Sequence, residues 1–297
     1  MPDTTTRTGV IGLGAMGAPM ARNLARAGLL AGVWNRTADK AAALAAELGV
    51  RHAPTPADLA RHCDVVLTCV SADADLLAVV DQALPGLDGD KLLIDTSTVQ
   101  PVTAVELARR LAEAGCGFLD APVSGGVEGA RQGTLAIMVG GDAQMLERAR
   151  PVLEAIGARI AHMGPVGSGQ ATKAVNQIMA AGINQAVSEA LAFAAAEGLP
   201  LDKVIEVVAS GAAGNWFLER RGPTMVRGEF PPGFRVALHH KDLAICKAIA
   251  ERHGVSLPVV EMTLIHYRRL IEAGHGDEDI SALFREKRRL FADKHDK

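Results

Sequence analysis

The first half of the chain alternates short apolar runs with longer segments in which apolar positions recur every three or four residues. A short apolar run predicts a buried strand, and the longer period predicts a helix. The predicted strands are 8–11, 30–34, 50–52, 65–70, 91–94, 116–120, 135–139 and 159–162. The predicted helices are 19–27, 38–48, a short one opening at 55–56, 75–84, one beginning at 101, and one that ends at 156. Strands that alternate with helices predict a parallel sheet covered by helices.

The second half is helical almost throughout. The predicted helices are 167–196, 201–209, a stretch after Asn215, 236–253, 258–272 and 280–292, separated by Gly and Pro. The helix 167–196 is apolar almost all round, which indicates a central helix or a subunit contact. The sequence therefore predicts an α/β domain over 1–164 and an all-helical domain over 165–297 that begins with this long connecting helix.

The composition argues against several classes of binding partner. The chain has 297 residues, a formal net charge of −3 and 3% aromatic residues. The sequence has neither a block of basic residues nor the aromatic residues needed to stack bases, so we expect no nucleic acid as a partner. The sequence also shows no signal peptide and no continuous apolar run of transmembrane length, so we expect a cytoplasmic protein that does not bind membranes. Its four cysteines have no metal-ligand spacing, and we expect no metal.

A glycine motif follows the first predicted strand. Gly12-Leu13-Gly14-Ala15-Met16-Gly17 reads G-x-G-x-x-G between a strand and a helix, the order of the dinucleotide fingerprint. The first glycine permits the tight turn, the second lets the main chain approach a pyrophosphate, and the third lets helix and strand pack closely. The motif predicts that domain 1–164 binds a dinucleotide.

The end of the second strand bears on which dinucleotide binds. An acidic residue there would bind the ribose 2′-hydroxyl of NAD. This chain has Asn35, Arg36 and Thr37 instead. A guanidinium and a hydroxyl suit a 2′-phosphate, so NADP is favoured. If Arg36 merely lies over the adenine, NAD is also usable.

Three further segments follow predicted strands. Val70 and Ser71 end one strand, at the sheet edge that faces the ligand in open α/β folds. Ser97 and Thr98 follow another strand and either cap a helix or reach the nicotinamide. The segment 121–135 is too rich in glycine for a strand or helix. Its Ser124-Gly125-Gly126 turn would offer main-chain N–H groups to a carboxylate, or it is a structural loop.

Lys173 and Asn176 stand near the start of the long helix. They are three residues apart, so they share one helix face. Together they could give a polar substrate a proton donor and a hydrogen-bond partner. The simpler interpretation is a solvated lysine.

Four motifs together resemble the β-hydroxyacid dehydrogenase family, which includes 3-hydroxyisobutyrate dehydrogenase, tartronate semialdehyde reductase and glyoxylate/succinic semialdehyde reductase. They are 12–24 (GLGAMGAPMARNL), 120–126 (DAPVSGG) with its continuation to 135, 167–177 (GSGQATKAVNQ) and 241–243 (KDL). The resemblance implies a Rossmann-type domain and a helical domain like that of 6-phosphogluconate dehydrogenase. It also implies a homodimer or homotetramer.

The resemblance further implies residue roles. Lys173 corresponds to the catalytic lysine, the 124–126 turn to the carboxylate loop, and Asn176 to a substrate-orienting amide. The cofactor contacts would be Val70, Ser71, Thr98 and Lys241, with Asp75 a weaker candidate. Trp216 either walls the substrate pocket or belongs to the core. The family often has Asn-Asn at the positions of Asn176 and Gln177. The Asn-Gln pair of this chain resembles the tartronate semialdehyde reductase type instead.

The implied reaction moves a hydride between nicotinamide and a short 3-hydroxy acid or its semialdehyde, a small carboxylate. Lys173 would exchange the proton. A lysine titrates near ~10.4, and acid–base work suits a pKa of about 7–8, so we expect a desolvated or positively charged setting. An imine reductase is one alternative, although such enzymes usually lack this lysine. The other is a dinucleotide-binding protein without catalysis.

Overall fold

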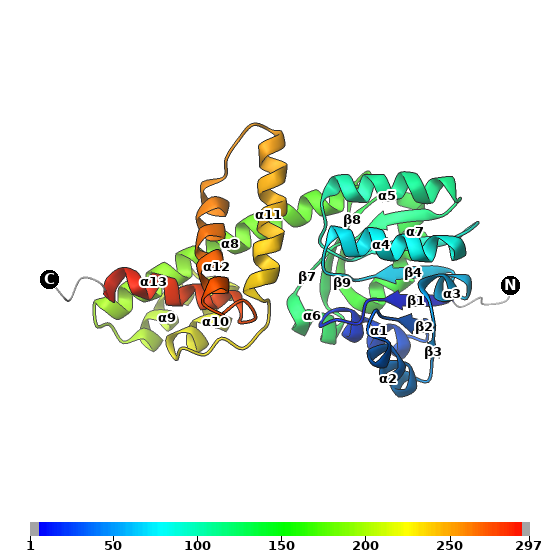
Figure 1. The fold of residues 1–297 in the computed structure, drawn as a ribbon. Coiled ribbons are helices and arrows are strands. Elements are labelled where there is room, and N and C mark those ends of the chain that lie inside the picture. Colours follow the sequence, from blue (N-terminus) through cyan, green and yellow to red (C-terminus); the bar gives the residue numbers. More distant parts are fainter. Residues whose placement is uncertain (1–5, 293–297) are drawn as a thin grey trace. The chain divides into compact units, whose positions relative to one another are not determined.

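The structure of the protein, a computed structural model, describes residues 6–292 and forms two compact units with their boundary between Lys173 and Ala174 (Figure 1). The first unit is built on one sheet. Its strands are β1 (Thr8–Ile11), β2 (Leu30–Trp34), β3 (Arg51–His52), β4 (Val65–Thr68), β5 (Leu92–Asp95), β6 (Gly117–Asp120), β7 (Val123–Ser124), β8 (Leu135–Gly140) and β9 (Gly157–Gly164).

The strand order is β3-β2-β1-β4-β5-β6-β8-β7, and β9 pairs with β8. Strands β1 to β6 pair in parallel, whereas β8 runs antiparallel to β6 and β7. The order 3-2-1-4-5-6 is that of the doubly wound dinucleotide-binding fold, in which the ligand binds where the order reverses. Here the reversal lies between β1 and β4. The predicted Rossmann-type fold is confirmed.

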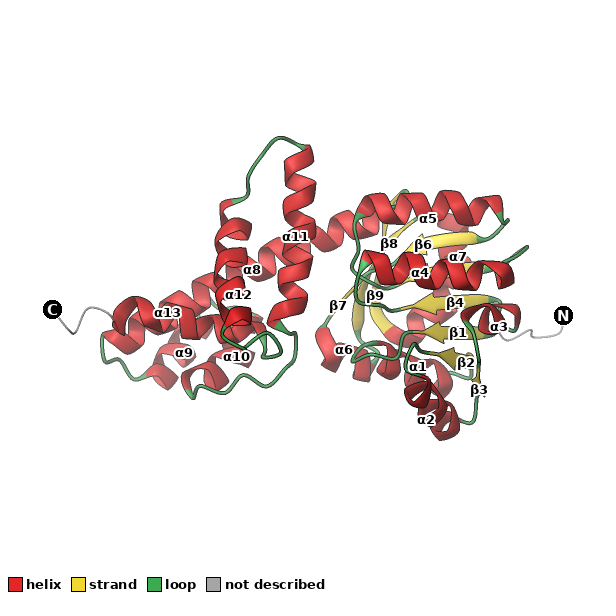
Figure 2. Cartoon of the chain, viewed as in Figure 1, coloured by secondary structure: helices red, strands yellow, loops and turns green. Residues whose placement is uncertain are grey.

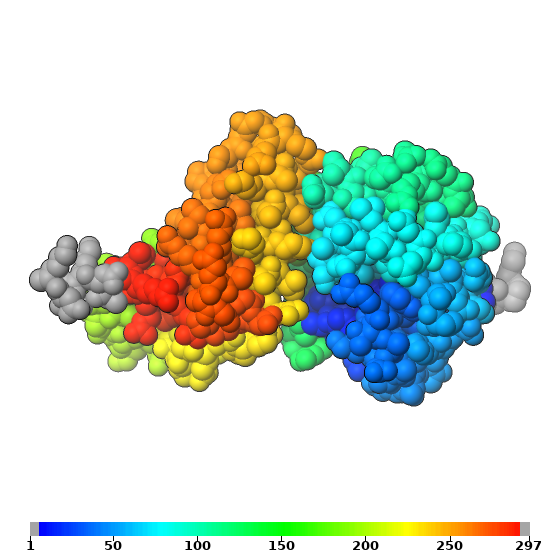
Figure 3. Space-filling model, in the orientation of Figure 1, coloured from blue at the N-terminus to red at the C-terminus, as the bar shows by residue number. Residues whose placement is uncertain are grey.

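Two hydrophobic cores flank the sheet, because successive strand residues point to opposite faces. Val10 belongs to one core and its neighbour Ile11 to the other. The first core includes residues of α1 (Gly17–Arg26), α2 (Ala38–Leu48) and α7 (Ala143–Ile156). The second includes residues of α3 (Pro56–Arg61), α4 (Asp73–Ala83) and α5 (Pro101–Glu113). Helices α4 and α5, cyan to green, cover the sheet on the side seen in the space-filling view (Figure 3).

The glycine-rich segment after β6 was predicted to be neither strand nor helix, and that prediction is wrong. It forms the short strand β7 and a helix, α6 (Gly126–Gln132). Gly125 (φ +132°) and Gly126 (φ +62°) make the turn into α6. A Cβ at Gly129 would lie 3.2 Å from a methyl carbon of Leu135, so this glycine permits close packing against β8. Tertiary packing therefore overrides the low helix propensity of glycine.

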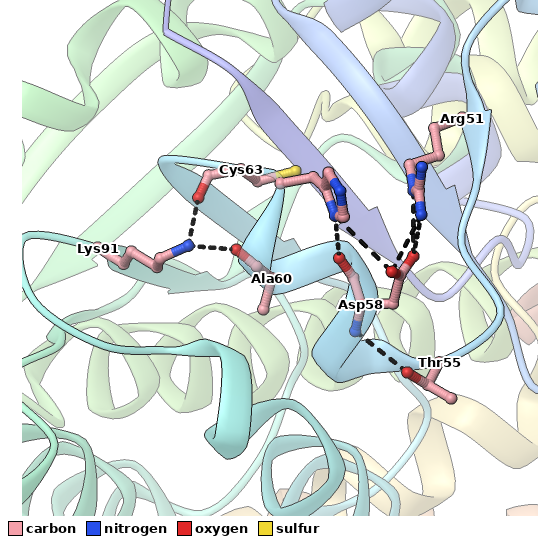
Figure 4. A network of polar contacts seen from close by, with 7 residues as sticks. Arg51, Thr55, Asp58, Ala60, Cys63 and Lys91 are labelled. Atoms are coloured by element: carbon pink, nitrogen blue, oxygen red, sulfur yellow. Dashed lines mark hydrogen bonds and ion pairs between the residues drawn. The ribbon is translucent and has the colours of Figure 1, made fainter.

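A network of polar contacts lies at the amino ends of the strands (Figure 4). Arg51, the first residue of β3, pairs with Asp58 of α3 over 2.8 Å. Lys91, directly before β5, donates from Nζ to the carbonyl oxygens of Ala60 and Cys63 over 2.6 and 3.2 Å. The lysine thus binds carbonyl groups at and just after the end of α3, and the Ala60 carbonyl also accepts from the N–H of Cys63 over 3.2 Å. The network lies at the edge opposite the glycine motif.

The second unit consists of helices (Figure 2). Helix α8 (Ser168–Ala196) runs through the boundary and is followed by α9 (Leu201–Ala209), α10 (Trp216–Val226), α11 (Val236–Arg252), α12 (Pro258–Glu272) and α13 (Leu283–Ala292). The predicted helix 280–292 begins instead as a 3₁₀ turn, η2 (Ile280–Ala282). Asp279 caps this turn, because its carboxylate accepts a hydrogen bond from the N–H of Ser281 over 3.1 Å. A second 3₁₀ turn, η1 (Leu84–Gly86), follows α4.

Helix α8 is the one helix within residues 6–292 that is long and apolar enough to cross a membrane by length and composition, with a mean hydropathy of 1.3. It also carries buried polar side chains. Asn184 donates from Nδ2 to the Tyr267 hydroxyl over 3.0 Å and to the Ile280 carbonyl over 2.8 Å. Ser188 donates to Asn184 Oδ1 over 3.1 Å. Such satisfied buried groups are typical of the core helix of a helical domain.

Candidate active site

The three motif glycines have different surroundings. A Cβ at Gly12 (φ +92°) would lie 2.2 Å from the carbonyl oxygen of Cys69, and one at Gly17 would lie 1.9 Å from that of Gly12. These two positions exclude any side chain. A Cβ at Gly14 would have no atom within 4 Å, and Gly14 and Ala15 are exposed. The protein therefore needs no glycine at position 14 for its own packing, and the open space there fits a pyrophosphate against the main chain.

Asn35 holds the glycine turn to the loop after β2. Its Oδ1 accepts a hydrogen bond from the N–H of Leu13 over 2.9 Å, and its Nδ2 donates to the carbonyl of Thr37 over 3.1 Å. The first bond joins two loops at the carboxyl ends of neighbouring strands, and the second fixes the amide within its own loop. A carboxylate here would lack the donor for Thr37.

Arg36 pairs with Asp75, itself predicted as a weaker candidate for a cofactor contact. The Arg36 Nη1 lies 2.9 Å from Asp75 Oδ1, and the Arg36 side chain is 86% exposed. Ser71 is also exposed, and Thr37 lies on the same exposed loop as Arg36. The pairing brings the start of α2 to the start of α4 across the edge where a cofactor would bind.

A surface hollow of about 450 Å³ lies beside the glycine turn and is lined by Gly14, Ala15 and Lys40, among others. Lys40 was not among the residues predicted from the sequence. The available signal was a cation three residues after Thr37, in the first turn of the following helix. A lysine there can offer a phosphate its ammonium.

The loops after β4 and β5 are joined by one serine. The Val70 N–H donates to Ser97 Oγ over 2.8 Å, and this hydroxyl donates to Asp95 Oδ1 over 2.7 Å. Thr68 also donates to Asp95 Oδ1, over 2.8 Å. Burial raises the pKa of Asp95 to about 6, against the hydrogen bonds from Ser97 and Thr68. Thr98, which follows Ser97, is partly exposed.

Lys173 lies beside the predicted carboxylate loop. Its side chain is buried, with 7% exposed, and Nζ donates to the carbonyl of Val123 over 2.9 Å. Val123 directly precedes Ser124, Gly125 and Gly126 in the chain. The structure therefore brings together two candidates that are 49 residues apart, Lys173 and Ser124. A solvated surface lysine, the simpler interpretation, is excluded by its burial.

Asp120 fixes the start of α8. Its Oδ1 accepts from the N–H of Gly167 over 2.8 Å, and its Oδ2 from the N–H of Gln170 over 2.9 Å. Burial raises the pKa of Asp120, and the hydrogen bonds from Gly167 and Gln170 oppose that rise. The carboxylate satisfies main-chain donors at the start of the helix. Its negative charge also interacts favourably with the positive end of the helix dipole. This role of Asp120 was not predicted from the sequence.

In the second unit, one buried carboxylate connects two predicted site residues. Asp242 accepts from Gln177 Nε2 over 2.6 Å and pairs with Lys241 Nζ over 2.9 Å. Gln177 Oε1 in turn accepts from Asn176 Nδ2 over 2.7 Å. Asn176 and Lys241 thus belong to one network. Gln177 and Asp242 were missed as its connecting members.

Trp216 begins α10 and is 62% exposed, so the alternative that it belongs to the core is wrong. The guanidinium of Arg221 lies 5.6 Å from its ring centroid. Within residues 6–292, no group of three or more His, Cys, Asp or Glu side chains is arranged to hold a metal ion.

Comparison with known proteins decides the family. Residues 7–164 match the model of the NAD binding domain of 6-phosphogluconate dehydrogenase. Residues 167–286 match that of the NAD-binding region of NADP-dependent 3-hydroxyisobutyrate dehydrogenase. The chain belongs to the β-hydroxyacid dehydrogenase family. This dehydrogenase is therefore an NAD(P)-dependent oxidoreductase, and the predicted family and enzyme class are confirmed.

Relatives cover almost the whole chain of this dehydrogenase. The 2-hydroxy-3-oxopropionate reductase of Escherichia coli is 39% identical over 259 residues, which are 85% of this chain and 87% of that protein. The NAD-dependent L-serine dehydrogenase of Pseudomonas aeruginosa is 35% identical over 283 residues, 92% of this chain and 95% of that protein. The solved structure of Mycobacterium tuberculosis 3-hydroxyisobutyrate dehydrogenase with L-serine has a TM-score of 0.88 at 33% identity, covering 96% of this chain and 100% of that one.

Proposed function

We propose that the protein interconverts a short 3-hydroxy acid and the corresponding semialdehyde, with Lys173 as the general acid and base. The observation that carries the proposal is the buried Nζ of Lys173, held 2.9 Å from the carbonyl of Val123 at the entrance to the Ser124–Gly126 turn. An ammonium has three N–H donors, so the bond to Val123 uses one of them while it fixes the position of Nζ.

Lys173 is proposed to handle the proton of the reaction. In reduction, its ammonium gives a proton to the oxygen that develops negative charge. In oxidation, its neutral amine takes the proton of the substrate hydroxyl. The nicotinamide, when bound, supplies or accepts the hydride. General acid–base catalysis of this kind contributes about 10²–10⁴-fold to the rate.

The Ser124–Gly126 turn is proposed to bind the substrate carboxylate. Its support is chemical: a hydroxyl and consecutive main-chain N–H groups suit an anion, and Lys173 adds a positive charge beside them. The compounds named for the relatives, 2-hydroxy-3-oxopropionate, L-serine and 3-hydroxyisobutyrate, are carboxylates with oxygen on carbon 3. Asn176 is proposed to orient this substrate, and Trp216 to contribute to its pocket.

NADP is the proposed preferred cofactor, with NAD as the possible alternative. One relative is named NAD-dependent and one matching model NADP-dependent, so the proposal depends on this chain's own residues. Arg36, Thr37 and Lys40 offer two cations and a hydroxyl to a 2′-phosphate. The remaining proposed contacts are the glycine turn with Leu13, Ala15 and Met16, together with Asn35, Val70, Ser71, Thr98 and Lys241.

A homodimer or homotetramer is proposed from the surface of α8. Exposed apolar residues lie three, four or seven positions apart along this helix, at Val175, Met179, Ala186, Ala190 and Phe193. Exposed apolar residues grouped on one helix in this way indicate an interaction site. Light scattering of the purified protein measures its mass, and Met179→Glu is expected to shift that mass toward the monomer.

A substrate panel tests the proposed reaction. Short 3-hydroxy acids and semialdehydes are compared with analogues that lack the carboxylate, using both cofactors and reading nicotinamide absorbance. We expect kcat/KM about 10- to 100-fold higher for the carboxylates, the size expected when a charged hydrogen-bonded group loses its partner. Equal efficiency with the uncharged analogues would contradict the carboxylate assignment.

A further inference from the structure

Gln170 holds the loop that contains Thr98 from both sides. The Gln170 side chain is buried, with 1% of the residue exposed. Its Oε1 accepts a hydrogen bond from the N–H of Val99 over 3.1 Å, and its Nε2 donates to the carbonyl of Ser97 over 2.8 Å. One amide therefore binds the main chain immediately before and immediately after Thr98.

Gln170 is itself fixed at the start of α8. Its main-chain N–H donates to Asp120 Oδ2 over 2.9 Å, and Lys173 follows three residues later, on the same helix face. The loop on the other side of the amide is fixed as well. Ser97 Oγ accepts from the N–H of Val70 over 2.8 Å. A short chain of hydrogen bonds thus connects the Val70 loop, the Thr98 loop and the helix turn that carries Lys173.

We propose that Gln170 is a positioning residue that sets the Thr98 loop relative to Lys173, and through it the place of the nicotinamide relative to the proton donor. The inference depends on the proposed function, because it assigns Lys173 the proton and Thr98 a cofactor contact. Gln170 touches neither substrate nor cofactor in this account. It acts through the main chain on each side of Thr98.

The chemistry of the side chain explains why an amide occupies this position. The site needs one acceptor for Val99 and one donor for Ser97, and a glutamine amide supplies both. Methionine has similar length but supplies neither bond. A protonated glutamic acid supplies an acceptor oxygen and a donor hydroxyl, whereas an ionised one has no donor and places a negative charge against the Ser97 carbonyl. In Gln170→Glu, the hydrogen bond to the Ser97 carbonyl can therefore form only while the new carboxyl group is protonated.

The experiment compares Gln170→Met with Gln185→Met, a matched control. Gln185 lies on the same helix, is also buried at 6% exposed, and bonds to Thr263 in the second unit. We expect Gln170→Met to lower kcat at least tenfold, to raise the deuterium isotope effect with a deuterated hydride donor, and to change the cofactor Kd less than threefold. Gln185→Met should keep kcat within twofold. Equal kcat in the two variants would overturn the proposal.

Gln170→Glu tests the same proposal by its pH profile and also serves if Gln170→Met does not fold. We expect kcat relative to that of the unmutated enzyme to fall at least fivefold as pH rises and the new carboxyl ionises. A ratio that stays flat across pH would contradict the positioning role. The Lys173→Ala variant separates the two accounts. If that variant is inactive while Gln170→Met matches its control, only this inference fails; if Lys173→Ala stays active, the proposed function fails.

Discussion

Gln177 donates a hydrogen bond from Nε2 to Oδ2 of Asp242 over 2.6 Å, between α8 and α11. The other oxygen of this buried carboxylate lies 2.9 Å from Nζ of Lys241. Gln177 meanwhile orients the amide of Asn176. A single carboxylate thus holds the polar groups that two separate sequence motifs contribute to the helical unit.

Removal of this carboxylate is predicted to destabilise the helical unit. Asp242→Ala leaves the Gln177 amide and the Lys241 ammonium without their acceptor, and hydrogen bonds to charged groups contribute about 1.5–3 kcal/mol. We expect the free energy of unfolding in urea to fall by on the order of 2 kcal/mol. Asp277→Ala is the control, because Asp277 forms an exposed pair with Arg235; its effect should stay within about 0.5 kcal/mol. Equal effects would show that the Asp242 network contributes little.

The glycine motif predicts a separation of binding from stability. Gly14→Ala introduces a methyl group that meets no protein atom within 4 Å, so the melting temperature should stay within about 2 °C. The dinucleotide Kd should rise at least about tenfold, because the methyl group keeps the pyrophosphate from approaching the main chain closely. Gly17→Ala drives a methyl group to 1.9 Å from the Gly12 carbonyl and should lower the melting temperature by several degrees. Calorimetry and cofactor titration measure both quantities. Unchanged cofactor affinity in folded Gly14→Ala would contradict the assigned phosphate site.

The Arg36–Asp75 pair predicts how cofactor preference changes. Arg36→Ala should lower kcat/KM with NADP about 10- to 100-fold, because a charged hydrogen bond of about 1.5–3 kcal/mol is lost, and should change the value with NAD less than about threefold. Asp75→Asn should raise the NADP-to-NAD ratio, because it removes a carboxylate that competes for the guanidinium. Arg51→Ala, at the opposite sheet edge, is the control. A strong NAD preference in the unmutated enzyme would refute the assignment.

Asp95 predicts a pH-dependent contribution to stability. Its pKa is about 6 in the folded protein and ordinarily 3.8. Between these values the folded state holds a proton that the unfolded state has lost, so stability falls as pH rises from about 4 to about 6 and levels off above that. The loss is on the order of 3 kcal/mol. Asp95→Asn should remove this decline, which urea unfolding of both proteins at pH 4.5 and 7 would measure. An equal decline in the variant would contradict the assigned cause.

Much of this fold is predictable because its patterns are local. The alternation of Val10 and Ile11 between two cores and the G-x-G-x-x-G turn depend on neighbours within a few residues. Helix α6 was missed for the opposite reason. Its glycines oppose helix formation locally, and packing such as that of Gly129 against Leu135 compensates only once the sheet has formed.

Several residues of the candidate site could be predicted from the sequence, but most of their contacts could not. Lys173 and the Ser124 turn could be proposed from motifs, but the bond from Lys173 to Val123 depends on how β7 and α8 pack. Asp120, Gln170 and Asp242 lie within the quoted motifs, but the groups that they bind could not be predicted, because each residue bonds to a group tens of residues away. The pairing of Arg36 with Asp75, 39 residues apart, is likewise visible only in the structure.

The most direct test of the account is kcat of Lys173→Ala at saturating cofactor and substrate, with cofactor binding verified by titration. Loss of the proposed general acid and base predicts a fall of about 10²–10⁴-fold in kcat, with a cofactor Kd close to that of the unmutated enzyme. A folded Lys173→Ala enzyme that keeps more than about a tenth of the original kcat would contradict the proposal that this buried ammonium carries the proton.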